Sequence, residues 1–225
     1  MEIYFIRHGK TAGNIQKRYV GSTDEPLCEE GICDLNARRE VILRAFLVHA
    51  GCSKQSDMEV ERNVEMLPEK VYVSPMLRCR QTAELLFPDA EQEVITDLRE
   101  MDFGEFEYKN YGELAGDQRY QAFIDSGGQM DFPGAEPQKK FRERVQRALA
   151  ECLKKKGAFM TNLESDESRG PLVFVVHGGT IMAIMERYAR PHKDYFDWQV
   201  SATHGYRCVL KCEEDSFYLE EVVEI

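Results

Sequence analysis

The sequence predicts an α/β fold in which a mostly parallel central sheet is flanked by helices. Two apolar runs, residues 2–6 and 172–176, are rich in β-branched and aromatic residues, as buried strands are. The second run is continuously hydrophobic, which is typical of a strand at the centre of a parallel sheet. The first run leads into Arg7-His8-Gly9 and the second into His177-Gly178. No internal repeat or linker divides the 225 residues, so one domain over residues 1–225 is expected.

The first strand is followed by a polar, glycine-containing loop over residues 11–26. A helix is expected over about residues 30–48, because apolar side chains recur there at helical spacing. These side chains are Ile32, Leu35, Ile42, Leu43 and Phe46. Residues 52–69 are polar and are expected to be mostly irregular, and residues 71–73 form the next strand.

The dipeptide Ser74-Pro75 predicts a helix start, with Ser74 as N-cap and Pro75 at the first helical position. The core stripe of this helix is expected to consist of Met76, Cys79, Ala83, Leu86 and Phe87. Arg78 lies on the other face, in the first turn. A positive charge there opposes the helix dipole, so Arg78 indicates a bound anion.

A short strand over residues 94–98 and an amphipathic helix enclose a segment rich in glycine and aromatic residues. This segment, about residues 102–137, is expected to form a lid or pocket wall rather than a core layer. The core face of the helix is expected to carry Phe141, Val145, Ala148, Leu149 and Cys152. The charged side chains of residues 138–147 are expected on its solvated face.

The rest of the chain begins with a charged linker at residues 157–170. After the strand at 172–176, a helix over residues 181–189 opens next to His177, a geometry suited to binding anions. Strands at residues 206–211 and 217–223 are expected at one edge of the sheet. The remaining histidines, His49, His192 and His204, are expected at a helix end, in a loop and in a turn, respectively.

The formal net charge of −11 argues against nucleic acid or an anionic membrane as the main partner. The apolar start is too short for a signal segment or a membrane span, so a cytoplasmic protein is expected. Its cysteines are scattered and odd in number, as free thiols in a reducing compartment are. They are Cys28, Cys33, Cys52, Cys79, Cys152, Cys208 and Cys212. None has metal-binding spacing and no Asp/His cluster has ligand spacing, so neither a metal site nor a cofactor is expected.

Five polar side chains stand at predicted strand ends or helix starts, namely Arg7, His8, Arg78, Glu100 and His177. In a parallel sheet these positions lie at one edge, so the five side chains should converge. Two arginines supply paired donors suited to a phosphoryl group. Two histidines supply a nucleophile and a second donor, and the carboxyl group supplies a general acid. Phosphoryl transfer through a phosphohistidine matches this set best.

Four segments of the sequence resemble the histidine phosphatase superfamily, whose fold is called phosphoglycerate mutase-like. They are FIRHGKTAGN at residues 5–14, SPMLRCRQTA at 74–83, LREMDFGEFE at 98–107 and VVHGGT at 175–180. The segments come in the order of the family and span most of the chain. The resemblance implies a three-layer sandwich with a lid insertion at about residues 102–137.

The resemblance also assigns roles to residues. His8 would be the phosphorylated nucleophile and Glu100 the proton donor, with Asp102 as the alternative donor. The phosphoryl oxygens would be bound by Arg7, Arg78 and His177, with further phosphate or substrate contacts from Asn14, Gly178 and Thr23. The family needs no metal. The two arginines should lower the pKa of His8 and keep its imidazole neutral, whereas the protonation state of His177 stays open.

The substrate is expected to be a small phosphate ester. Lys10 follows the Arg-His-Gly motif and is expected to add positive charge near the site. The lid lacks the basic cluster that a phosphoglycerate mutase would use for its substrate carboxylate, which favours a phosphatase. The resemblance suggests α-ribazole phosphate first, and sugar phosphates, phosphoglycerates and small aromatic phosphates are the other open substrates. The alternatives are mutase-type phosphoryl transfer and a catalytically weak protein that binds phosphorylated ligands. A monomer and a homodimer are both compatible with the sequence.

Overall fold

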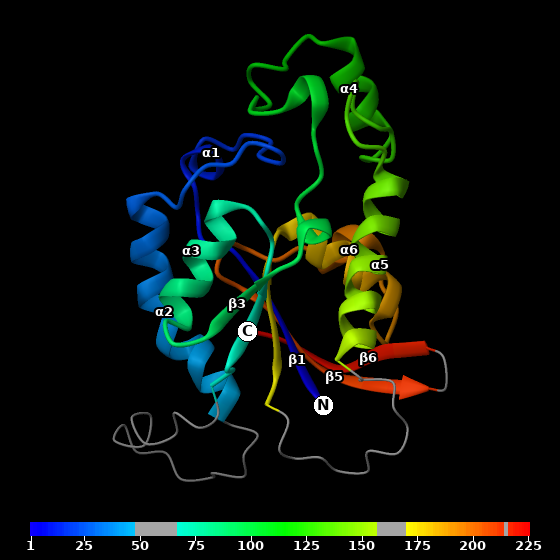
Figure 1. Ribbon diagram of the computed structural model, residues 1–225. Coiled ribbons are helices and arrows are strands. Elements are labelled where there is room, and N and C mark those ends of the chain that lie inside the picture. Colours follow the sequence, from blue (N-terminus) through cyan, green and yellow to red (C-terminus); the bar gives the residue numbers. More distant parts are fainter. Residues whose placement is uncertain (48–66, 157–169, 214–215) are drawn as a thin grey trace.

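The computed structural model describes residues 1–47, 67–156, 170–213 and 216–225. In these ranges the chain forms a mixed six-stranded sheet in the order β3-β2-β4-β1-β5-β6 (Figure 1). The parallel strands are β1 (Glu2–Arg7), β2 (Lys70–Val73), β3 (Glu91–Val94) and β4 (Leu172–Val176). An antiparallel pair, β5 (Gly205–Glu213) and β6 (Ser216–Glu224), completes one edge. The predicted α/β class is confirmed, and the continuously hydrophobic β4 lies at the centre.

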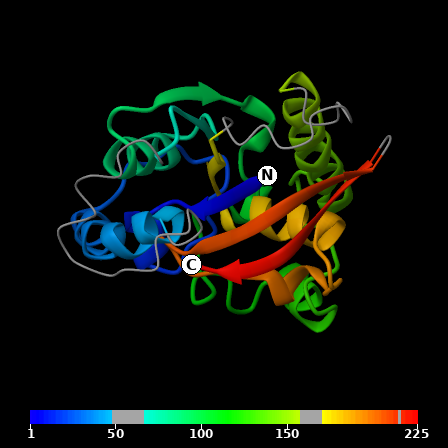
Figure 2. The same cartoon turned by 90° about the horizontal axis from the view of Figure 1, so that it is seen from below.

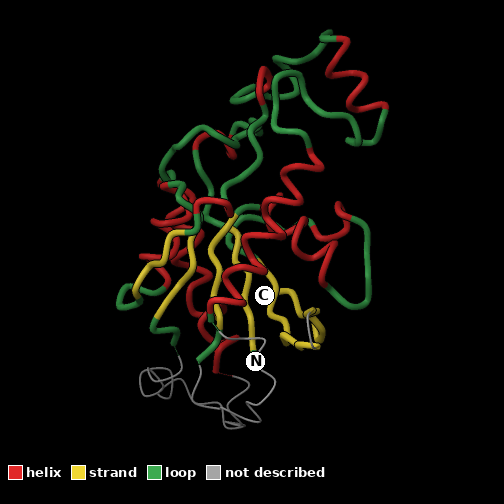
Figure 3. Tube along the Cα trace, turned by 45° about the vertical axis from the view of Figure 1, so that its right-hand side comes forward, coloured by secondary structure: helices red, strands yellow, loops and turns green. Residues whose placement is uncertain are grey.

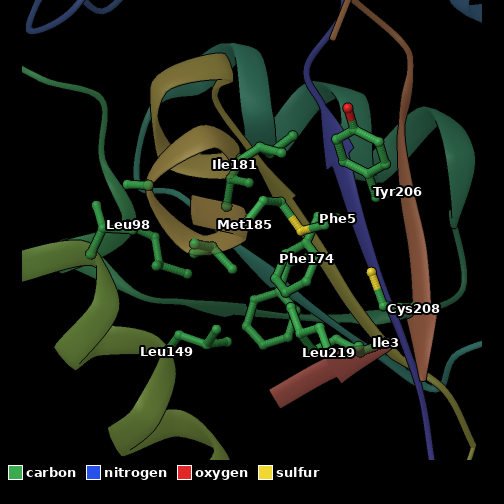
Figure 4. Packing of buried hydrophobic residues seen from close by; sticks show 14 of the residues in the cluster. Ile3, Phe5, Leu98, Leu149, Phe174, Ile181, Met185, Tyr206, Cys208 and Leu219 are labelled. Atoms are coloured by element: carbon green, nitrogen blue, oxygen red, sulfur yellow. The ribbon is translucent and has the colours of Figure 1, made fainter. Parts of the chain in front are cut away.

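Helices cover both faces of the sheet (Figures 1 and 2). On one face lie α2 (Glu29–Leu47) and α3 (Leu77–Leu86), and on the other lie α5 (Gln138–Lys155) and α6 (Gly178–Tyr188). Alternate residues of β1 supply the two cores, because successive strand side chains point to opposite faces. Tyr4 and Ile6 pack in the cluster shared with α2 and α3. Ile3 and Phe5 pack in the cluster shared with α5 and α6, as Figure 4 shows.

Residues 102–137 lie beyond the carboxyl ends of the parallel strands, at the top of Figure 1 (see also Figure 3). They contain a 3₁₀ turn, η3 (Gly104–Phe106), and the short helix α4 (Gln118–Asp125). The buried side chains of this segment form a small cluster of their own, made of Phe106, Leu114, Tyr120 and Phe132. The segment therefore packs around an apolar cluster of its own.

Several boundaries differ from the sequence prediction. The expected strand at 94–98 is instead β3 at Glu91–Val94, followed by the 3₁₀ turn η2 (Thr96–Leu98). This edge strand is polar, and Lys70 of β2 pairs with the carboxylates of Glu91 and Glu93, so apolar patterning does not reveal it. The expected loop at 11–26 contains a short helix, α1 (Ala12–Ile15), and α6 begins at Gly178 rather than at residue 181.

The prediction of Ser74 as an N-cap is wrong. Helix α3 begins at Leu77 with Met76 as its N-cap. The Ser74 hydroxyl lies 2.7 Å from Nε2 of His177, and its oxygen makes only a longer contact, 3.4 Å, with the amide of Met76 before the helix.

Two of the three remaining histidines lie where the sequence predicts them. His204 lies in the turn before β5, as predicted, and His192 lies in a loop. His49, Cys52 and most of the predicted irregular stretch at 52–69 fall outside the described residues, as does most of the predicted linker at 157–170. Within the described ranges, no helix has the length and apolar character needed to cross a membrane.

Candidate active site

The two histidines meet because β1 and β4 are neighbouring parallel strands. His8 and His177 each follow one of these strands directly, and the amide of His8 donates to the Val176 carbonyl at 3.0 Å. Their ring centroids are 5.1 Å apart. Both side chains are buried. The structure thus brings the two predicted histidines to one point at the carboxyl edge of the sheet, where α/β proteins bind ligands.

Arg78 enters this point from the first turn of α3 and is fully buried. Its guanidinium donates to the carbonyl oxygens of Thr23 at 2.8 Å and Gly21 at 2.9 Å. Arg7, at the end of β1, donates through Nη1 to the Val200 carbonyl at 2.6 Å. Among the described residues, Nε of Arg7 and Nε of Arg78 are buried donors without a hydrogen-bond partner. A buried and a partly buried arginine, each with a buried Nε that has no partner, form a binding environment for an oxyanion.

The imidazole of His8 is oriented by the backbone. Its Nδ1 lies 2.7 Å from the carbonyl oxygen of Gly9, which can only accept, so Nδ1 carries the proton and Nε2 keeps its lone pair. Thr82 holds the preceding peptide group, between His8 and Gly9, because its hydroxyl accepts from the Gly9 amide at 3.0 Å and donates to the Arg78 carbonyl. Burial, then the charges of Arg78 and Arg7, hold the pKa of His8 well below 6.5. A neutral imidazole with an available Nε2 can act as a nucleophile.

His177 is held from the opposite side of the site. Its Nε2 lies 2.7 Å from the Ser74 hydroxyl. Burial, followed by the charge of Arg78, holds the pKa of His177 well below its ordinary value. The sequence left the protonation state of His177 open, and the structure favours the neutral form. A neutral ring can still donate one hydrogen bond to an oxyanion.

Glu100 is the carboxyl group at the site. Its Oε1 accepts from the Met101 amide and its Oε2 from the Gly179 amide, both at 2.9 Å. Burial raises the pKa of Glu100 above 4.5, against the lowering effect of these hydrogen bonds and of the two arginines. Gly179 permits this approach, because a Cβ there would lie 2.3 Å from Oε1 of Glu100. A carboxyl group with a raised pKa can give and take a proton near neutral pH.

Asp102, the alternative proton donor, is exposed and accepts from the Gly104 amide at 2.7 Å. Glu100 lines a cavity of about 340 Å³ above the site, together with Arg7, and its carboxylate is held by the amide of Gly179, close to His177. Asp102 has neither contact, and the buried His8, Arg78 and His177 are not among the lining residues. The geometry therefore favours Glu100 over Asp102.

Of the three further phosphate or substrate contacts predicted from the sequence, two line the cavity and one does not. Asn14 and Gly178 line the cavity, and the Oδ1 of Asn14 also caps α1 by accepting from the Thr11 amide at 3.2 Å. Thr23 is not among the cavity-lining residues and acts through its backbone carbonyl, which holds Arg78. Lys10 does not line the cavity either. Its ammonium is directed to α2, where it pairs with Glu30 at 2.9 Å and Asp34 at 2.6 Å, so the expected positive charge is not delivered to the site.

A family model described as the histidine phosphatase superfamily (branch 1) matches residues 3–56 and 53–225. The chain belongs to this superfamily. The two matches together extend over almost the whole sequence, and they include all five converging side chains. No group of three or more His, Cys, Asp or Glu side chains that could hold a metal ion occurs in the described part of this superfamily member.

Curated relatives carry two kinds of name. "Adenosylcobalamin/alpha-ribazole phosphatase" of Salmonella typhimurium (strain LT2) is 25% identical over 191 residues, which cover 83% of this chain and 79% of that protein. "Probable phosphoglycerate mutase GpmB" of Enterobacter sp. (strain 638) is 25% identical over 158 residues, which cover 68% of this chain and 64% of that protein. The chain thus spans less than two-thirds of the length of the latter relative.

Solved structures share the fold. A mycobacterial glucosyl-3-phosphoglycerate phosphatase in complex with VO3 superposes with a TM-score of 0.73 at 20% identity, covering 97% of this chain and 95% of that one. The alpha-ribazole phosphatase from Shigella flexneri gives a TM-score of 0.70 at 19% identity, covering 97% and 94%. A phosphoglycerate mutase from Thermus thermophilus gives 0.58 at 26% identity, covering 92% of each chain. These structures bear out the phosphoglycerate mutase-like fold.

Two buried networks that support the site were not predicted from the sequence. The Glu107 carboxylate accepts from the amides of Gly21 and Thr23, at 2.8 and 3.0 Å, and so fixes the loop whose carbonyls hold Arg78. Arg144 of α5 donates to the carbonyls of Asp97 and Arg99, at 2.7 and 3.1 Å, just before Glu100. The sequence placed Arg144 on a solvated helix face, but it is only 7% exposed.

Arg144 also forms a mostly buried ion pair with Glu136, at 2.8 and 2.6 Å. We expect Arg144→Met to lower the free energy of unfolding by about 3–5 kcal/mol, because it leaves the Glu136 carboxylate buried and unpaired. The double variant Arg144→Met/Glu136→Met should recover a large part of this loss. Urea denaturation of Arg144→Met, Glu136→Met and the double variant measures the coupling energy between Arg144 and Glu136. The exposed Arg147→Met is the matched control, and simple additivity of the two losses would contradict the network.

The two buried histidines make stability depend on pH. In the unfolded chain a histidine binds a proton below about pH 6.5, whereas folded His8 and His177 stay neutral there because their pKa values are lowered. Acidification therefore favours unfolding, and stability is lost as the pH falls from about 6.5 toward the folded pKa values. We expect each histidine to contribute a loss of about 1 kcal/mol between pH 7.5 and 5.5.

Urea denaturation at the two pH values checks this prediction. His177→Gln should show a smaller difference in stability between pH 7.5 and 5.5 than the wild type, whereas His192→Gln, in an exposed loop, should keep the wild-type difference. An unchanged difference in His177→Gln would contradict the prediction.

Proposed function

We propose that this protein is a phosphatase that hydrolyses a small phosphate monoester through a phosphohistidine intermediate on His8, without a metal ion. The observation that carries the proposal is the juxtaposition of a neutral His8, with Nε2 available, and two arginines, Arg78 and the partly buried Arg7, whose buried Nε atoms have no partner. Membership in the histidine phosphatase superfamily supports it. We keep the sequence-based expectations of a single domain and a cytoplasmic location as part of the proposal.

In the first step, Nε2 of His8 attacks phosphorus and the bond between phosphorus and the ester oxygen breaks. Protonated Glu100 gives its proton to the leaving oxygen, and its raised pKa favours this form. In the second step, a water oxygen attacks the phosphohistidine while the Glu100 carboxylate takes a proton from the water. The P–N bond breaks, inorganic phosphate leaves, and His8 and Glu100 return to their starting protonation states.

The transferred oxygens are assigned to the fixed donors around His8. Arg7 and Arg78 supply positive charge, and His177 supplies a hydrogen bond. Asn14 and the backbone of Gly178 at the start of α6 border the cavity and are the remaining proposed contacts. Donors that are already oriented stabilise the charge of a phosphoryl group in transit without further reorganisation.

A phosphatase is favoured over a mutase by the charges around the cavity. A phosphoglycerate carries a carboxylate in addition to its phosphate, and this second anion needs a cation. Arg18 and Arg142 line the cavity, but they are paired with Glu113 at 2.6 Å and Glu186 at 2.8 Å, respectively. α-Ribazole phosphate and sugar phosphates are the proposed candidate substrates, the first supported by the name of a curated relative.

The test is the release of phosphate from p-nitrophenyl phosphate and from a panel of metabolite phosphates, in the presence of excess EDTA. The proposal predicts turnover that the chelator does not reduce. A protein that binds vanadate or phosphate but turns over no ester would contradict the proposal and would favour a binding protein instead.

A further inference from the structure

The cavity above the site is bordered largely by aromatic side chains. They include Tyr19, Phe103, Phe123, Phe132, Tyr195 and Phe196. Phe123 belongs to α4, whereas Phe196 belongs to the 3₁₀ turn η4 (Tyr195–Trp198) in the body of the protein. The aromatic wall is therefore assembled from segments that are far apart in the sequence.

Phe123 and Phe196 meet at Gly128. A Cβ added to Gly128 would lie 3.0 Å from Cζ of Phe196 and 3.5 Å from Cζ of Phe123, and the φ of Gly128 is +78°. Glycine at this position lets the edges of the two rings approach the same stretch of backbone. Phe196 is 51% exposed, so it stands at the rim, where a ligand enters.

The rings are held in place by one another. The ring centroids of Phe123 and Phe132 are 4.2 Å apart, and those of Phe132 and Tyr19 are 5.1 Å apart. On the opposite side, Tyr195 meets Phe196 edge-on at 5.1 Å. A wall that is formed in advance loses little conformational freedom when a planar ligand packs against it.

Three polar side chains of the same wall, Arg18, Arg142 and Gln138, already have partners, whereas the exposed amide of Gln199 has no side-chain hydrogen bond within the described residues. The Arg18 guanidinium contacts Glu113 at 2.6 and 3.2 Å, and that of Arg142 contacts Glu186 at 2.8 and 3.0 Å. The Gln138 amide group donates to two backbone carbonyls, both at 2.8 Å. A second anion or a sugar hydroxyl would have to compete with these contacts. An aromatic ring can pack against the wall without displacing any of these contacts.

We infer that the leaving group of the substrate carries a planar aromatic ring system and no second negative charge, and that Phe123 and Phe196 select this ring. The inference rests on the proposed phosphatase function, which it makes more specific. The cavity volume of about 340 Å³ is at the small end of the range for ligand pockets, which fits one phosphate and one ring system.

Binding separates this inference from the proposed reaction. We would measure the dissociation constants of 3-phenylpropylphosphonate, 3-cyclohexylpropylphosphonate and 3-carboxypropylphosphonate by calorimetry. These three phosphonates cannot be hydrolysed, and they differ only in the distal group. Aromatic pairing predicts that the phenyl compound binds about two- to tenfold more tightly than the cyclohexyl compound. The carboxylate compound should bind most weakly.

Turnover of matched esters is the second arm. In 2-phenylethyl and 2-cyclohexylethyl phosphate the ester oxygen is bonded to the same kind of carbon, so the leaving alcohols have similar acidity. Phe123→Leu and Phe196→Leu should each reduce the ratio of their kcat/KM values toward one. Tyr111→Leu removes a 73% exposed aromatic side chain of the same segment, which does not line the cavity, and should leave the ratio unchanged. Inhibition by vanadate should be unchanged in all three variants, which shows that they are folded.

Equal affinities for the phenyl and cyclohexyl phosphonates would overturn the inference, as would a preference for the carboxylate compound. So would an ester ratio that survives both phenylalanine substitutions. An enzyme that turns over neither ester but prefers the phenyl phosphonate would overturn the proposed reaction and uphold the aromatic preference.

Discussion

Replacing His8 by alanine is expected to abolish phosphatase activity, with a loss of at least about 10⁴ in kcat. The alanine variant has no nitrogen with which to attack phosphorus, whereas Arg7, Arg78 and His177 stay in place to bind phosphate. The expected result is therefore a protein that binds vanadate but releases no phosphate from p-nitrophenyl phosphate. Removal of a buried histidine that stays neutral should also reduce the destabilisation at low pH, which reports independently on the state of His8.

His192→Ala is the matched control, because His192 lies in a loop with an exposed side chain and should leave kcat unchanged. Residual activity of His8→Ala above about one per cent of the wild type would contradict the assignment of His8 as nucleophile, since a group that only binds phosphate contributes less than a nucleophile.

Replacing Glu100 by glutamine is expected to lower kcat by about 10²–10⁴ for esters of simple alcohols, because the amide cannot give a proton to the leaving oxygen. The loss should be much smaller for p-nitrophenyl phosphate, whose leaving group departs without a proton. A merely structural effect of the substitution would lower both rates alike. Steady-state kinetics with a series of leaving groups of rising pKa measures the difference.

The pH dependence of wild-type activity should report the ionisation of both Glu100 and His8. Activity on alkyl esters requires protonated Glu100, so it should fall as the pH rises through the raised pKa of this carboxyl group. It should also fall as the pH drops through the lowered pKa of His8, below which the nucleophile is protonated. Glu100→Gln should lose the descending limb at higher pH, while Asp102→Asn should keep it. The reverse result would make Asp102 the proton donor.

The parts of this site that the sequence predicts are those set by local pattern. A buried strand followed by His-Gly places the side chain at the edge of the sheet in any parallel arrangement, which located His8 and His177. Arg78 was recognisable because a cation in the first turn of a helix opposes the dipole. The central strands and the long amphipathic helices were predictable from hydrophobic periodicity, which is also a local pattern.

The supporting contacts depend on pairs of residues that are far apart in the sequence. Ser74 reaches His177 across 103 positions, and Glu107 reaches Thr23 across 84. Nothing in the local pattern of a serine before a proline distinguishes a helix cap from a histidine partner. Arg144 was assigned to a solvated face because charged residues surround it, and only the fold shows that it points inward. The prediction that Lys10 adds positive charge at the site was wrong because its two acidic partners come from α2, about 20 residues later in the sequence, and local pattern does not reveal them.

The central claim, that His8 becomes phosphorylated, is tested most directly by trapping the intermediate. The enzyme would be mixed with a ³²P-labelled ester, quenched with alkali, in which a P–N bond is stable, and digested for peptide mapping. We expect label on the peptide that contains His8. In Glu100→Gln the label should approach one equivalent per molecule if the substitution slows hydrolysis of the phosphohistidine more than its formation. Phosphate release by the wild type with no labelled peptide, or with label at His177, would contradict the central claim.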